Sequence, residues 1–359
     1  MAISPEVLND ALQELAPQYQ NLFERWSPTI KKIIDGGNVE RSRLMGPFKE
    51  FRVITGGPGD VTHIVDGGER LAPTRADITA KGSTYAARLI YHFLVPDKDM
   101  AEAVGPTGVE HLIKQYPEAA LMDFHQRLAT QFVTGNGNGC GGALTLNGDA
   151  QYSPQGTLRQ GAMQFSTTQN DTVFGLAKED ATAGVTGWKN GYADISSMAS
   201  DGLKTLRQEY YRASRKGRLL GPVDILLADE TSYTNYIDLL EDRIIVEDVV
   251  KGEAGAEEVT QGIKFLNATM YIEEYLDVAA STFTTTAAQN GVIYGLKSST
   301  WHMYTLGSDS NMETKGDFAI RGPTRRPDMD AHQWEFVYYQ GMFCDYLAAN
   351  FVVTGGNTP

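Results

Sequence analysis

The chain carries two strand-like runs, FKEFRVI at 48–54 and YAARLIYHFLV at 85–95, that decide how its fold is interpreted. Both runs are rich in aromatic and branched residues, which is typical of pleated strands. Eleven extended residues span about 36 Å. About thirty residues separate the runs, many of them Gly or Pro, and such a connection is uncommon inside a compact domain unless it is functional or packs elsewhere. We therefore expect a long hairpin that projects from its own subunit and docks on a neighbouring copy.

The composition is that of a globular chain. Of the 359 residues, 42% are hydrophobic and 21% are charged, unlike a disordered sequence. The formal net charge of −14 argues against an extended grip on nucleic acid, because neutralising many phosphates needs a basic surface. No secretory signal and no apolar run of about eighteen residues is present, so we expect no membrane span. Cys140 and Cys344 are too few for a disulfide scaffold, which favours a reducing compartment.

Apolar spacing predicts an N-terminal arm. Leu8, Leu12 and Leu15 share one face of a short helix, and Phe23 and Trp26 continue the apolar stripe beyond Pro17. We interpret this stripe as the edge of an arm that packs against another part of an assembly.

The rest of the chain alternates helices and strands. The longest helical pattern runs from Gly108 to Thr134, with Pro117 either starting or kinking the main helix. Further predicted elements are a helix at 192–214, a buried strand at 222–228, a helix at 232–240, strand-like runs at 262–276 and 291–306, and two closing strands at 333–340 and 343–353.

No catalytic, cofactor-binding or metal-binding residue is predicted. The glycine-rich run at 135–142 follows a helix instead of a strand and lacks the lysine of a phosphate-binding loop. The six histidines do not pair at metal-ligand spacing. His332 with Asp328 and Asp330 is interpreted as polar surface.

Two basic clusters stand out from the acidic background. The first is Arg207, Arg212, Arg215, Lys216 and Arg218, near a helix C-terminus, where cations are favourable. The second is Arg321, Arg325 and Arg326, in a predicted Gly/Pro loop. Arginine forks suit carboxylates, so we expect these clusters to pair across subunit interfaces.

The order of these parts resembles the major capsid proteins of tailed double-stranded DNA bacteriophages, which have the Hong Kong 97-type fold. In that family an arm leads to an extended loop, a spine helix, a peripheral domain, an axial domain and a return to the peripheral domain. The spine helix is matched by 116–135, the entry to the axial domain by VDILLAD at 223–229 and YTNY at 233–236, and the late strands by GVIYGL at 291–296 and QGMFC at 340–344.

The resemblance implies an α+β chain divided into an arm at 1–35, an extended loop at 36–97, a peripheral domain with the spine helix at 98–220, an axial domain at 221–290 and the return at 291–359. It implies a structural virion protein and not an enzyme, with no cofactor. Hexamers and pentamers would assemble in the host cytoplasm into an icosahedral head that encloses double-stranded DNA without sequence-specific binding.

The resemblance also implies partners and contact residues. No N-terminal scaffolding segment is recognised, so a separate scaffolding protein is expected, with a portal and, in some members, a decoration protein. Some members cross-link a loop lysine to a late asparagine, positions loosely matched by Lys81 and Asn350, but most members do not, so no cross-link is expected. Subunit contacts are expected at Leu8, Leu12, Leu15, Phe23, Trp26, Arg70, Arg75, Lys81, Arg321, Arg325 and Arg326.

Two other interpretations remain open at this point. An encapsulin-like nanocompartment shell would share the fold and enclose protein cargo. A soluble enzyme would assemble its site from scattered residues and would form a small oligomer with a concave pocket. Large particles without turnover would distinguish a shell from an enzyme.

Overall fold

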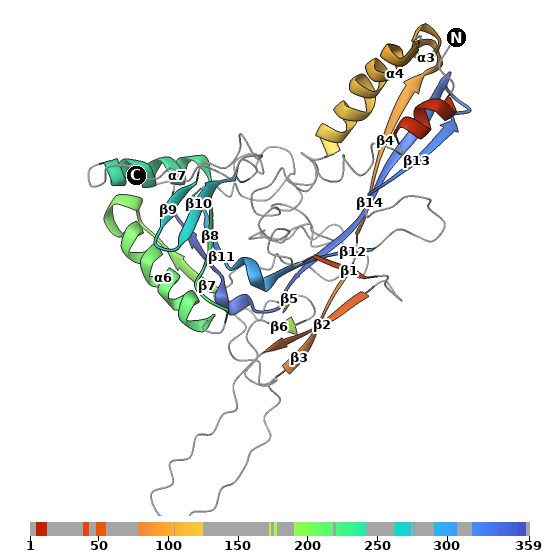
Figure 1. The fold of residues 1–359 in the computed structure, drawn as a ribbon. Coiled ribbons are helices and arrows are strands. Elements are labelled where there is room, and N and C mark those ends of the chain that lie inside the picture. Colours follow the sequence, from red (N-terminus) through yellow and green to blue (C-terminus); the bar gives the residue numbers. More distant parts are fainter. Residues whose placement is uncertain are drawn as a thin grey trace, which may run out of the picture.

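The computed structural model describes residues 5–12, 39–42, 48–54, 79–85, 87–103, 105–124, 172–173, 176–177, 190–217, 220–241, 262–273, 276, 291–306 and 318–356. These residues form a mixed α+β structure with two large sheets in separate lobes, together with two short two-stranded sheets (Figure 1). None of the described helices is long and apolar enough to cross a membrane.

The first lobe is built around one long strand, β14 (Ala331–Cys344). Its antiparallel neighbours are β4 (Ala87–Pro96), β12 (Trp301–Leu306) and β13 (Phe318–Arg325), and β1 (Val39–Ser42) lies parallel to β12. Aromatic side chains join the strands: the Phe93 ring centroid lies 4.9 Å from that of Phe336 and 6.0 Å from that of Trp334. Gly341 lies inside β14, so the predicted break between two closing strands at this glycine is wrong.

The predicted pairing of the hairpin is also wrong. Strand β2 (Phe48–Ile54) pairs antiparallel with β3 (Thr79–Tyr85), from Phe48 opposite Tyr85 to Ile54 opposite Thr79. The second aromatic run forms β4, which pairs with β14 along ten residues. The reason is packing: β4 buries Phe93 and Val95 against the aromatic β14, whereas TAKGSTY in β3 has too little apolar character to be recognised. Residues 55–78 lie outside the described part.

The second lobe is a six-stranded sheet. Its order is β7 (Gly191–Asp194), β15 (Phe351–Thr354), β11 (Ile293–Leu296), β8 (Ile225–Ala228), β10 (Ala268–Ile272) and β9 (Ile263–Phe265), with β7/β15 and β8/β10 parallel. Helices α6 (Leu203–Lys216) and α7 (Glu230–Glu241) lie against it (Figure 1). The sheet therefore combines strands from three of the predicted divisions of the chain, 98–220, 221–290 and 291–359.

The helices differ in part from expectation. After α3 (Asp97–Glu102), α4 (Gly105–Ile113) continues through a π-helical segment, η1 (Lys114–Glu118), into further α-helix at 119–124. Pro117 lies inside η1, within a helix that begins at Gly105, so the alternative that Pro117 starts the main helix is wrong. The helix predicted at 192–214 is wrong at its start, because β7 occupies 191–194 and α6 follows a π-helical segment, η3 (Met198–Gly202).

The remaining elements are short. They are β5 (Thr172–Val173), β6 (Leu176–Ala177), η4 (Ser298–Thr300) and η5 (Leu347–Ala349).

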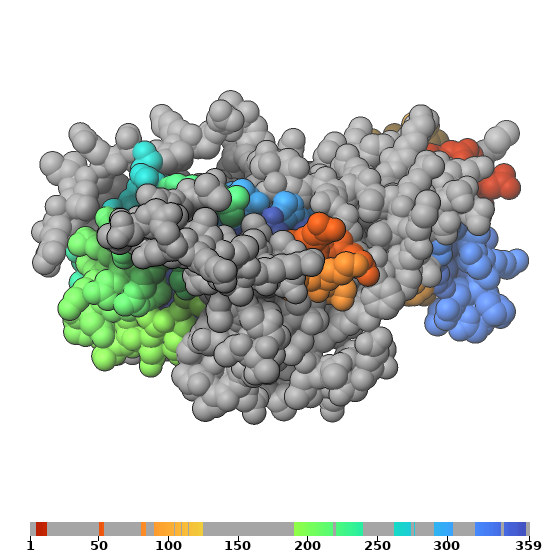
Figure 2. All heavy atoms as spheres, turned by 90° about the horizontal axis from the view of Figure 1, so that it is seen from below, coloured from red at the N-terminus to blue at the C-terminus, as the bar shows by residue number. Residues whose placement is uncertain are grey.

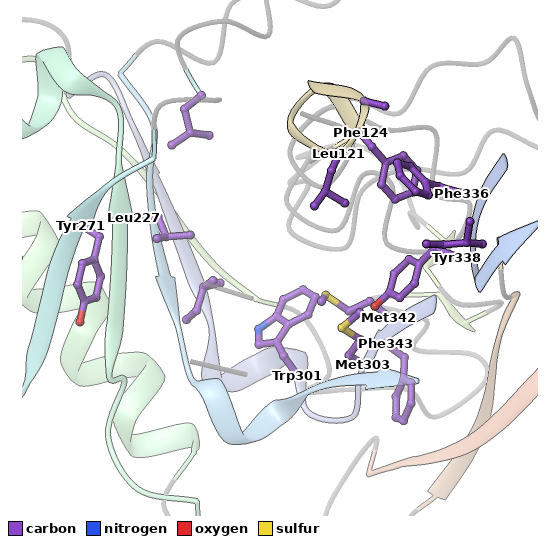
Figure 3. Close-up of a cluster of buried hydrophobic side chains, with 14 of the residues drawn as sticks. Leu121, Phe124, Leu227, Tyr271, Trp301, Met303, Phe336, Tyr338, Met342 and Phe343 are labelled. Atoms are coloured by element: carbon purple, nitrogen blue, oxygen red, sulfur yellow. The ribbon is translucent and has the colours of Figure 1, made fainter. Parts of the chain in front are cut away.

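One hydrophobic cluster joins the two lobes. It contains Leu227 and Tyr271 from the six-stranded sheet and, from the other lobe, Trp301, Met342 and Phe336 (Figure 3). A second cluster fills the space between the six-stranded sheet and its helices, with Leu206, Tyr210, Phe265, Met270 and Phe351 among its members. Because the first cluster draws on both sheets, the lobes share part of one core.

Candidate assembly surface

The second arginine cluster lies on β13 and at the start of the turn that leads to β14. Arg321 and Arg325 lie on β13 and not in the predicted loop, and Arg321 is in register with Glu335 of β14. The strand is irregular between Arg321 and Thr324, where Gly322 has φ +139°. A Cβ atom at Gly322 would lie 2.7 Å from Cδ1 of Trp334, so both the backbone conformation and the close approach require glycine there.

Arg325 and Arg326 already have partners in their own chain. Nη2 of Arg325 lies 3.4 Å from Oδ1 of Asp330 and 3.7 Å from Oδ2 of Asp97. Nε of Arg326 lies 3.1 Å from Oδ1 of Asp328. These ion pairs lie within one chain, and the expectation that the arginines bind carboxylates of another subunit stays a prediction. Exposed pairs of this kind contribute about 0–1 kcal/mol, so they add little to the stability of the subunit.

Asp97 links this end of the sheet to α3. It is the first residue of the helix, where a carboxylate is favourable, and its Oδ1 lies 3.4 Å from Nε2 of His332. The backbone amide of Asp97 also donates to the Asp330 carbonyl at 3.1 Å. His332 and Asp330 thus join the strand ends to α3, whereas Asp328 pairs with Arg326 in the turn between β13 and β14.

The N-terminal helix at 5–12 packs within its own subunit. Leu8 and Leu12 have no exposed surface and belong to the core cluster that also contains Phe93 and Val95. Val7, on the outer face, is 52% exposed. Leu8 and Leu12 therefore take part in the core of their own subunit, and their contact with another subunit stays a prediction. Five other predicted contact residues lie outside the described residues: Leu15, Phe23, Trp26, Arg70 and Arg75.

Lys81 and Asn350 differ sharply in accessibility. Nζ of Lys81 lies 3.3 Å from Oε2 of Glu50 on the opposite strand, and both side chains are exposed. Asn350 is completely buried. Its side chain is enclosed by its own subunit, which argues against Asn350 as the acceptor of a cross-link.

The Asn350 amide holds together both described chain crossings between the lobes. Its Oδ1 accepts from the Lys297 amide at 2.8 Å, in the segment that joins β11 to β12, and from Nε1 of Trp301, the first residue of β12, at 3.1 Å. Its Nδ2 donates to the Tyr346 carbonyl at 3.2 Å, in the segment that joins β14 to β15. Sequence reasoning missed this role because the two segments, about fifty residues apart in the sequence, meet only in the folded chain.

A second polar contact reinforces the first crossing. Asp224, just before β8, accepts from the Ser298 amide at 2.8 Å and lies 3.4 Å from Nζ of Lys297. The crossing between β11 and β12 is therefore anchored to the six-stranded sheet at two positions.

The described residues give little support to catalytic chemistry. No group of three or more His, Cys, Asp or Glu among them is placed to hold a metal ion. Burial is the main reason that the pKa of the Cys344 thiol is raised far above its usual value, so this thiol stays protonated at neutral pH. Its Sγ lies 3.7 Å from Oγ1 of Thr300, inside the core.

Comparison with known proteins identifies the fold. No protein-family model and no curated protein sequence matches the chain. Solved structures do: a chain of the cyanophage A-1(L) capsid asymmetric unit aligns with a TM-score of 0.53 at 10% identity, covering 88% of this chain and 90% of that one. A chain of the capsid of a native GTA particle aligns with a TM-score of 0.50 at 8% identity, covering 90% of each.

These alignments extend over nearly the whole of each chain and include both lobes. At such low identity they establish the fold alone. The chain therefore has the mixed α+β Hong Kong 97-type fold of tailed-phage and GTA capsid proteins.

Proposed function

We propose that this chain is a phage major capsid protein that forms the icosahedral head. The observation that carries the proposal is the likeness to a cyanophage capsid chain, which leaves only about a tenth of either chain unmatched. A chain that uses almost all of its length for this fold has little left over for a separate function. The proposed place of action is the virion, after assembly in the host cytoplasm.

We further propose hexamers and pentamers as the building units. The described lobes suggest a revised division, with the six-stranded sheet as the axial domain and the β14 sheet as the peripheral domain. The segment at 55–78, carried by β2 and β3, is proposed to dock on a neighbour through Arg70 and Arg75, with Lys81 at its base. Permanent interfaces of this kind bury more than about 2,000 Å².

Enclosed DNA fits the charge of the chain. A net charge of −14 favours a wall that does not grip phosphates, and repulsion extends over about one Debye length, roughly 8 Å at physiological salt. We expect isolated subunits to bind duplex DNA weakly and without sequence preference. A separate scaffolding protein and a portal are part of the proposal, as in the family that the chain resembles.

The experiment is electron microscopy of purified protein, alone and co-expressed with candidate scaffolding proteins. Closed shells are expected, and a strictly monomeric species by light scattering under all assembly conditions would refute the proposal. Nuclease-protected DNA inside particles would indicate a phage head, whereas protein cargo would indicate a nanocompartment. Deleting residues 56–77, which leaves β2 and β3 intact, should preserve subunit folding and prevent normal shells.

A further inference from the structure

The outer face of α6 is basic along its whole length. Lys204, Arg207, Arg215 and Lys216 are exposed, while Leu206, Tyr210 and Ala213 are buried on the opposite face. Figure 2 shows this lime-green segment uncovered at one end of the molecule. In a chain with 45 acidic and 31 basic residues, this face has the opposite charge to the whole.

The helix dipole explains only part of this pattern. It favours cations in the last turn, which accounts for Arg215 and Lys216. Lys204 and Arg207 lie more than two turns before the end of α6, where this effect has faded. The only carboxylate of α6, Glu209, is buried and pairs with Arg212. Among the described residues, Lys204, Arg207, Arg215 and Lys216 form no ion pair, so no carboxylate of the described part of the chain neutralises these four exposed cations.

The face also carries features of a protein contact. Tyr211 is 52% exposed between Arg207 and Arg215, and exposed tyrosine and arginine are enriched at interfaces. Beside it lies an open hollow of about 490 Å³, lined by Arg207 and Tyr211 from α6 and by Leu239 from α7. The hollow offers apolar surface next to the charges.

The chain itself supplies a matching acidic surface on α7. This helix has no Lys, Arg or His, and Glu230 and Asp238 are exposed. Glu230 and Asp238 are eight residues apart, about 12 Å along a helix, and Arg207 and Arg215 have the same separation on α6. Two α-helices side by side can therefore place both arginines opposite both carboxylates, whichever way the helices run.

We propose that the α6 face of one subunit docks on the acidic α7 of a second copy of this chain. The inference rests on the proposed function, since it names one contact by which capsid subunits associate. The occupant is a second copy because each copy carries both surfaces, and a contact between two different surfaces can close into a ring. Duplex DNA is disfavoured because acidic α7 borders the same hollow.

The test is a charge swap. Arg207→Glu with Arg215→Glu should weaken subunit association roughly tenfold, from two lost ion pairs and new repulsion. Lys98→Glu with Lys264→Glu makes the same charge change at exposed sites outside α6 and α7 and should have a much smaller effect. Adding Asp238→Arg to the first variant should recover part of the association. Sedimentation velocity at low and high salt measures association, and thermal unfolding confirms that each variant folds.

Each outcome decides the matter. If the wild type forms shells and the α6 variant matches its control, or if Asp238→Arg gives no recovery, the inference is wrong while the proposed function stands. If the wild type never associates, both fail. Binding of a labelled DNA duplex that is lost in the α6 variant would assign the face to nucleic acid instead. Arg207→Gln with Arg215→Gln replaces the glutamate pair if the latter does not fold.

Discussion

Replacing Asn350 with alanine should destabilise the subunit by about 3–4 kcal/mol. The Asn350 side chain is completely buried, and its Oδ1 is the acceptor for the Lys297 amide and for Nε1 of Trp301. Trp301 is 1% exposed, so its ring N–H would be left buried without this partner. An orphaned buried donor costs about 1–3 kcal/mol. We assign about 3 to Trp301 and about 1 to the partly buried Lys297 amide.

The assay is equilibrium urea unfolding of unassembled subunits at low protein concentration. The unfolding free energies of wild type and variant are compared when both depend on urea concentration with the same slope. Asn235→Ala is the matched control, because the Asn235 amide makes a half-buried hydrogen bond of 3.0 Å to the Gly356 carbonyl. That loss should cost about 0.5–1.5 kcal/mol. A loss below about 1 kcal/mol for Asn350→Ala would show that water or side-chain movement satisfies Trp301, and the reasoning would be refuted.

Four further variants test packing, assembly and protonation. Gly295→Ala should lower stability by about 1–3 kcal/mol in thermal unfolding, because a Cβ there would lie 2.1 Å from Cε1 of Phe351; an unchanged melting temperature would contradict this. Leu12→Ala should cost the subunit about 2–5 kcal/mol, whereas Trp26→Ala should weaken particles more than subunit melting; equal losses for Trp26 would place it in the core. Hydrogen bonding to Asp99 is the main cause that raises the pKa of Tyr116 to about 12. The stabilisation from this hydrogen bond is therefore present below pH 10 and is lost between pH 10 and 12. Tyr116→Phe should flatten the dependence of the free energy of unfolding on pH in that window, and an unchanged slope would argue against the contact.

Local patterns in the sequence predicted local structure well. The buried strand at 222–228 and the helix at 232–240 correspond to β8 and α7, because continuous apolar character and helical spacing are visible within a few residues. The family resemblance also led to the correct fold. Each part was weak alone, and their order carried the information.

Pairing between strands that are far apart in the sequence could not be predicted in the same way. Strand β4 pairs with β14 across more than two hundred residues, and nothing near residues 87–96 indicates that partner. The weak signal of β3 then led to the wrong hairpin. For the contact residues, Leu8 and Leu12 looked like an exposed apolar edge because the surface that buries them comes from distant strands. The sequence showed the basic residues of α6. The eight-residue spacing of Glu230 and Asp238 on α7 could be compared with that of Arg207 and Arg215 only when the structure placed both helices beside one hollow.

The Asn350 junction has a consequence for the mechanics of a shell. One side chain fastens both described crossings between the lobes, and a shared apolar cluster lies beside them. A subunit held in this way resists bending between its two lobes and behaves as one rigid body. The difference in curvature between five-fold and six-fold positions must then arise at the interfaces between neighbouring subunits. Variation in angle between neighbouring copies, rather than within one copy, is the expected source of the shell's shape.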